Sequence, residues 1–123
     1  MPLGVSSDDT GALVDFLEKT TSRPSFLIIY ASPRPSDGLM WCGDCRRAEP
    51  LISEKFSKGS TNVRTVYAGT EVEWRTLTNP YRQPPFSIEK LPTILKVYEN
   101  GWHRLVEEHC YDQQKLDDFV DRS

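Results

Sequence analysis

The sequence predicts an α/β protein with a central mixed sheet and helices on both faces. A solid apolar run at residues 26–31 is typical of a strand buried on both sides. Two alternating segments flank an Asn100-Gly101 pair, which is the strongest short-range signal for a hairpin. Apolar residues recur at helical spacing before and after the buried strand. Strands that alternate with helices and finish in a hairpin indicate a mixed sheet.

In the first half of the chain we expect a helix, a strand, a loop and a second helix. The first helix is expected over residues 8–20, which begin with acidic capping residues. Residues 32–40 contain prolines and a glycine and therefore predict a loop after the apolar strand. The second helix should begin within the CxxC motif of residues 42–45 and end at Gly59. A short strand is also expected at residues 3–5.

In the second half, residues 63–68 alternate between apolar and polar side chains and predict another strand. Residues 69–87 are polar with scattered prolines, and the sequence favours no particular structure there. The hairpin strands are expected at residues 93–98 and 102–107. The final helix is expected over residues 113–120, which place their apolar side chains on one face.

Length and charge limit the kind of protein this can be. A chain of 123 residues suits a single domain over residues 1–123. Its net charge of −3 gives no reason to expect a nucleic-acid partner, and its longest apolar run is far too short to span a membrane. The first residues do not resemble a secretory signal, and the three cysteines are an odd count. We therefore expect a cytoplasmic protein, and nothing in the sequence requires more than a monomer.

Cys42 and Cys45 are the candidate reactive groups. On the first turn of a helix, thiols three positions apart come close enough to bond, and the helix N-terminus favours a thiolate at the outer one. Such a thiolate attacks a disulfide, and the deeper thiol resolves the mixed disulfide. The Leu91-Pro92 bond before the hairpin can be cis, which supports a deliberate structural role for Pro92.

A zinc site and a pair of passive thiols are the alternative interpretations of this motif. Zinc would need four ligands, and the remaining soft donors are Cys110, His109 and His103. If the strand continued through residues 109 and 110, these neighbours would point to opposite faces. We therefore expect no metal site, a buried and inert Cys110, and two surface histidines.

The motif Trp41-Cys42-Gly43-Asp44-Cys45, followed by Ala48-Glu49-Pro50 and by Leu91-Pro92-Thr93, resembles the thioredoxin fold. More narrowly, it resembles the small cytosolic thioredoxin-related proteins whose motif reads WCPDC. The resemblance implies a disulfide reductase with no bound cofactor, which thioredoxin reductase and NADPH keep reduced. It also implies that the substrates are small disulfides such as cystine and selected protein disulfides.

Carried over by position, the resemblance makes Cys42 the nucleophile and Cys45 the resolving thiol. It makes Pro92 the cis proline that faces them and the backbone of Leu91 the dock for an extended substrate. Trp41 and Gly43 would also border the substrate, and the alternative for Trp41 is that it merely packs the loop.

The chain departs from these families at two places. Gly43 replaces the usual proline, which loosens the turn. Thioredoxins also carry a buried acid in the strand before the motif, and residues 26–31 contain none. Asp44 is therefore the candidate proton acceptor for Cys45, directly or through water, or else a modulator of the Cys42 pKa.

Two other functions remain open on the sequence. A glutaredoxin-type enzyme would use glutathione, but it usually carries a tyrosine where Asp44 stands and a glycine pair after the cis proline. A non-catalytic module would use the Cys42–Cys45 disulfide only as a redox-dependent docking switch, since fold and function separate easily.

Overall fold

The computed structural model describes residues 5–6, 9–19, 24–57, 62–99 and 101–121. Within them the chain forms α1 (Thr10–Glu18), β1 (Ser25–Tyr30), α2 (Gly43–Ser57), β2 (Asn62–Tyr67), α3 (Glu71–Arg75), η1 (Pro80–Arg82), β3 (Thr93–Tyr98), β4 (Gly101–Val106), η2 (Glu107–Tyr111) and α4 (Gln113–Asp121). The strands pair in the order β2-β1-β3-β4. Since β1 is parallel to β2 and antiparallel to β3, the predicted mixed sheet is confirmed.

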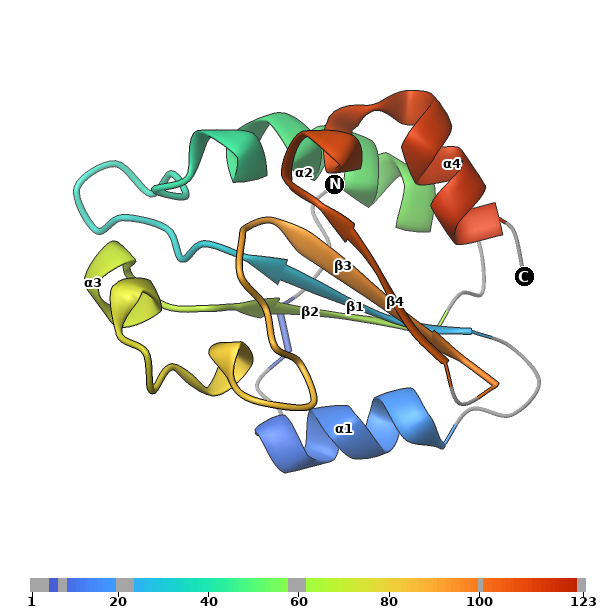
Figure 1. Cartoon of the computed structure of the whole chain (residues 1–123). Helices are drawn as coiled ribbons and strands as arrows, with labels where there is room; N and C mark the ends of the chain where they lie inside the picture. Colours follow the sequence, from blue (N-terminus) through green and yellow to red (C-terminus); the bar gives the residue numbers. More distant parts are fainter. Residues whose placement is uncertain (1–4, 7–8, 20–23, 58–61, 100, 122–123) are drawn as a thin grey trace.

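Helices cover both faces of this sheet, as predicted. Figure 1 shows α1 beneath the sheet and α2 and α4 above it. All residues of β1 are buried, which is the burial that its unbroken apolar run predicts. Phe26 of β1 meets Phe56 of α2 edge to face, with 5.1 Å between the ring centroids. The sheet and the helices on both faces thus share a hydrophobic core.

The predicted elements lie close to the observed ones. The first helix, the buried strand and the second helix correspond to α1, β1 and α2, and the hairpin corresponds to β3 and β4. The expected end of α2 at Gly59 lies outside the described residues, as does most of the strand expected at residues 3–5. Nearby, the backbone N–H of Ser6 donates to the carbonyl of Thr65 at 2.6 Å.

Residues 69–87, for which the sequence favoured no structure, contain a short helix with a complete capping box. The Thr70 hydroxyl accepts from the Glu73 N–H, and the Glu73 carboxylate accepts from the Thr70 N–H. This Thr-x-x-Glu pattern is visible in the sequence and is a known signal for a helix start. It places α3 directly after β2, beside the loop that leads into α2 (Figure 1).

The chain does not continue as a strand through residues 109 and 110, so the condition on which these two residues would point to opposite faces is not met. β4 ends at Val106, and η2 begins at Glu107, whose φ of 52° turns the backbone out of the extended conformation. The Glu107 N–H donates to the Pro92 carbonyl at 2.9 Å, which holds the turn against the start of β3. The segment that follows therefore leaves the sheet and packs against α2.

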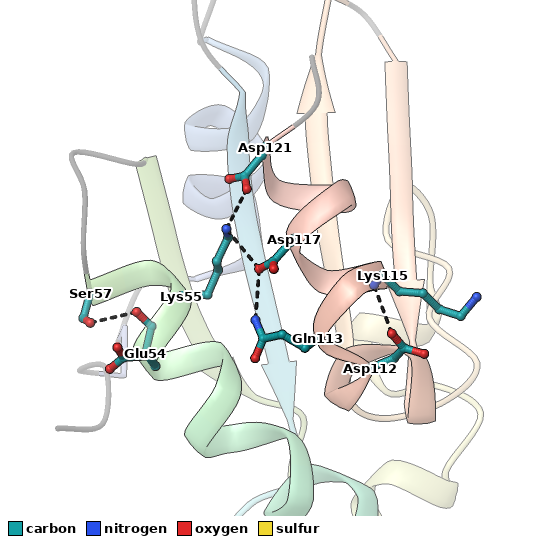
Figure 2. Close-up of polar contacts among 8 residues, drawn as sticks. All are labelled: Glu54, Lys55, Ser57, Asp112, Gln113, Lys115, Asp117 and Asp121. Atoms are coloured by element: carbon teal, nitrogen blue, oxygen red, sulfur yellow. Dashed lines mark hydrogen bonds and ion pairs between the residues drawn. The ribbon is translucent and has the colours of Figure 1, made fainter.

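The last helix is attached to the far end of α2 by charged side chains. Figure 2 shows Lys55 of α2 between two acids of α4. Its ammonium group lies 3.1 Å from the Asp117 carboxylate and 2.7 Å from that of Asp121. Gln113 donates to Asp117 from one turn earlier in α4. This group connects the C-terminal end of α2 to the C-terminal helix.

Candidate active site

Cys42 is the N-cap residue of α2. Its carbonyl accepts the first helical hydrogen bond, from the Arg46 N–H at 3.2 Å, and the helix itself begins at Gly43. The preceding loop folds back on itself, because Pro33 forms an isolated bridge with Met40. The loop therefore returns the chain to the end of β1 and leaves Cys42 at the start of the helix.

This position favours a thiolate at Cys42. A hydrogen bond from the Cys45 thiol is the main reason that the pKa of Cys42 falls to about 6. The backbone N–H groups of Cys45 and Asp44 lower that pKa further, while partial burial and the Asp44 charge oppose them. These N–H groups belong to the first turn of α2, where no carbonyl of the helix accepts from them. The half-buried Cys42 thus combines access with a stabilised anion.

Cys45 has the opposite surroundings. Its side chain is fully buried, and its hydrogen bond to Cys42, together with burial, raises its pKa. The Ala31 N–H donates to its sulfur at 3.4 Å and partly opposes this rise. The two thiols are therefore unequal, with the ionised form favoured at Cys42 and the protonated form at Cys45.

The Leu91-Pro92 segment lies against Cys42. The peptide bond between these residues is cis, and the Cys42 thiol donates to the Leu91 carbonyl at 3.5 Å. The structure therefore brings together the two chain segments that the sequence analysis singled out.

Trp41 and Gly43 flank Cys42 in different ways. The Trp41 indole N–H donates to the Gly69 carbonyl at 2.9 Å, which ties the loop before α2 to the chain after β2. A Cβ added at Gly43 would meet its nearest neighbour, the Arg46 guanidinium, at 3.6 Å, an ordinary contact. Space alone therefore does not require glycine at position 43.

Asp44 is held by two donors on the surface of α2. Its Oδ1 atom accepts from the Arg47 guanidinium and from the Tyr111 hydroxyl, both at 3.1 Å. Arg46 binds the Met40 carbonyl instead, so only Arg47 of this pair offsets the Asp44 charge by direct contact. Among the contacts of the described residues, none joins the Asp44 carboxylate directly to Cys45, and its role as a proton acceptor stays a prediction.

Sequence reasoning missed Tyr111. It reaches Asp44 across 67 positions of the chain, and no local pattern indicates such a contact. The one available signal for Tyr111 was its position next to Cys110, because a neighbour of a residue expected to be buried lies close to the core. Cys110 is fully buried and donates to the Leu105 carbonyl at 3.3 Å, and burial raises its pKa to about 12.

The histidines lie on the surface, where the sequence placed them. In the described part of the chain, no group of three or more histidine, cysteine or acidic side chains is arranged to hold a metal ion. None of the helices there is long and apolar enough to cross a membrane.

A cavity of about 410 Å³ adjoins the loop before α2. Tyr30, Met40, Arg46 and Glu49 contribute to its lining. The Tyr30 side chain is almost completely buried, and burial raises its pKa, followed by the Glu49 charge. Cys42 is not part of this lining, so the cavity lies beside the candidate active site rather than within it.

The family profile and the similar proteins both point to the same family. The profile of the thioredoxin domain of the thioredoxin domain-containing protein 17-like family matches residues 8–122. A thioredoxin domain-containing protein of Schizosaccharomyces pombe is 32% identical, and the alignment covers 98% of each chain. The thioredoxin-like protein Clot of Arabidopsis thaliana is 33% identical over 64% of this chain and 61% of its own length, which is under two thirds of that protein.

Solved structures show the same fold. The crystal structure of Trxlp from Edwardsiella tarda superposes with a TM-score of 0.63 and 18% identity, and it covers 95% of this chain and 98% of its own. A likeness at 18% identity shows that the two proteins share a fold, and it carries no information on function.

Proposed function

The chain belongs to the thioredoxin domain-containing protein 17-like family, and from this membership and the unequal thiols we propose that it is a disulfide reductase. A thioredoxin-type redox function follows from the family. We further propose that one thioredoxin-like domain over residues 1–123 acts as a cytoplasmic monomer without a bound cofactor. Its electrons would come from NADPH through thioredoxin reductase.

The observation that carries this proposal is the difference between Cys42 and Cys45. Cys42 is half-buried with a pKa near neutral, whereas Cys45 is fully buried with a raised pKa. A nucleophile needs access and a thiolate, while a resolving thiol must stay protonated until the mixed disulfide has formed. The two environments match these two requirements.

In the proposed reaction, the Cys42 thiolate attacks one sulfur of the substrate disulfide. The substrate S–S bond breaks, its other sulfur leaves and takes a proton, and a mixed disulfide with Cys42 forms. Cys45 then loses its proton and attacks the Cys42 sulfur, which releases the second substrate thiol. The substrate has gained two electrons, and the Cys42–Cys45 disulfide is reduced again by the reductase.

We propose that the substrate docks against the segment around Pro92. Leu91 offers a backbone carbonyl 3.5 Å from the Cys42 sulfur, at the position where an extended chain would add backbone hydrogen bonds. Trp41 and Gly43 border the same thiol. We propose cystine and exposed peptide disulfides as substrates, because the half-buried Cys42 requires a sulfur that can approach it.

A coupled assay tests the function. Wild type, Cys42→Ser and Cys45→Ser are compared with NADPH, the thioredoxin reductase of the same organism, and either cystine or insulin. We expect NADPH consumption with wild type, none above background with Cys42→Ser, and an accumulating mixed disulfide with Cys45→Ser.

Two outcomes would contradict the proposal. Turnover that requires glutathione would favour a glutaredoxin-type enzyme. Absence of turnover with every disulfide, in a protein whose Cys42 still reacts with iodoacetamide, would favour the docking module.

A further inference from the structure

Tyr111 brings a protonated hydroxyl to the start of α2. It lies at the end of η2, half-buried, and donates to Asp44 Oδ1 at 3.1 Å. Partial desolvation and the Asp44 carboxylate raise the Tyr111 pKa, so its hydroxyl remains a donor at neutral pH. Asp44 directly follows Gly43 in the first turn, and its own N–H is one of the groups that lower the Cys42 pKa.

Asp44 acts on Cys42 in two opposite ways. Its backbone N–H favours the thiolate, and its carboxylate opposes it. Tyr111 and Arg47 both donate to the same carboxylate oxygen and offset part of its charge. In the described part of the chain, the titratable or charged side chains that act on Cys42 or on this carboxylate include Asp44, Cys45 and Arg47 of α2, and Cys110 and Tyr111 of η2.

The position of Tyr111 depends on contacts between η2 and the Pro92 segment, which lies against Cys42. Pro92 accepts a backbone hydrogen bond from Glu107 at 2.9 Å, at the start of η2. The Cys110 thiol donates to the Leu105 carbonyl at 3.3 Å and lies 3.8 Å from the Pro92 carbonyl. These contacts connect η2 to the segment that accepts from Cys42, so Tyr111 approaches Asp44 from a well-anchored turn.

We propose that Tyr111 is a positioning residue for the dithiol, which holds the Asp44 carboxylate against Arg47 and thereby limits how strongly that charge opposes the Cys42 thiolate. This inference rests on the proposed function, because it concerns the reactivity of the same thiol. It assigns a role to a residue outside the CxxC motif and the cis-proline segment.

The test is the pH profile of Cys42 alkylation by iodoacetamide, with the labelled cysteine located by mass spectrometry. Tyr111→Phe keeps the ring and removes the hydroxyl. We expect alkylation about two- to threefold slower at pH 5.5, because the less compensated carboxylate disfavours the thiolate, and an unchanged rate at pH 9, where Cys42 is fully ionised. Tyr98→Phe, at the opposite end of β3 from Pro92, is the matched control and should leave the profile unchanged.

The same substitution in an Asp44→Asn background separates this role from packing. Asparagine carries no charge, so Tyr111→Phe should have no further effect there. An equal slowing in both backgrounds, or no slowing in the wild-type background, would overturn the proposal. Alkylation needs neither a reductase nor a disulfide substrate, so the result stands even if the coupled assay shows no turnover.

Discussion

The two ends of α2 are both held by side chains from the segment after β4, yet they differ in what those contacts do. At the N-terminal end, Tyr111 of η2 donates to Asp44, next to Cys42. At the C-terminal end, Asp117 and Asp121 of α4 pair with Lys55 (Figure 2). Both sets join α2 to residues more than half the chain away.

The two sets of contacts differ in what lies beside them. At the N-terminal end, Asp44 lies two positions after Cys42, and its charge acts on the ionisation of that thiol. At the C-terminal end, Lys55 is 19% exposed and its acids are 42% and 62% exposed, and water and salt screen their interaction. Similar polar contacts therefore adjust reactivity at one end and only connect two helices at the other.

The largest effect is expected from removing the hydrogen bond between the two thiols. Cys45→Ala deletes the donor that contributes most to the low pKa of Cys42. Alkylation of Cys42 at pH 6 should slow by about tenfold or more, since each pKa unit is worth roughly 1.4 kcal/mol. Cys45→Ser keeps a donor and should retain most of the wild-type rate. Equal rates for the two variants would show that the backbone N–H groups of the first turn, rather than the hydrogen bond from the Cys45 side chain, lower the pKa of Cys42.

A smaller effect is expected on stability. The folded-state pKa of Cys42, about 6, lies below the unfolded value. Its contribution is therefore fully present above the unfolded pKa of about 8.5 and is lost as pH falls through 6. Between pH 6 and pH 8, the free energy of unfolding of the reduced wild type should rise by about 1 to 2 kcal/mol more than that of Cys42→Ser, after allowance for screening. Urea unfolding measures this difference. Parallel pH curves for the two proteins would contradict a thiolate at Cys42.

The smallest effect is expected at the other end of α2. Lys55→Met removes both ion pairs and should destabilise the fold by about 0.5 kcal/mol, less in 1 M salt. Arg75→Met breaks the more exposed pair with Glu71 and serves as the control for a purely local contact. Neither variant should change the pH profile of Cys42 alkylation. A changed profile in Lys55→Met would mean that the two ends of the helix are coupled.

Much of the fold was predictable because its signals are local. The buried strand β1, the hairpin of β3 and β4, and the start of α2 inside the CxxC motif each follow from spacing within a few residues. The helix α3 was predictable as well, since Thr70 and Glu73 form a capping box, although the scattered prolines nearby concealed it.

The sequence by itself determined the fold class and the dithiol, because a CxxC at a helix start is a short-range pattern, and the resemblance to thioredoxins added the proline segment that would face the dithiol. Only the tertiary structure decided that η2 leaves the sheet at Glu107 and that Tyr111 meets Asp44. The physical reason is that hydrogen bonds and desolvation depend on distance in space. A contact between residues 67 positions apart leaves no periodic signal in the chain. The reactive thiol was therefore predictable, and the residue proposed to adjust its charge environment was not.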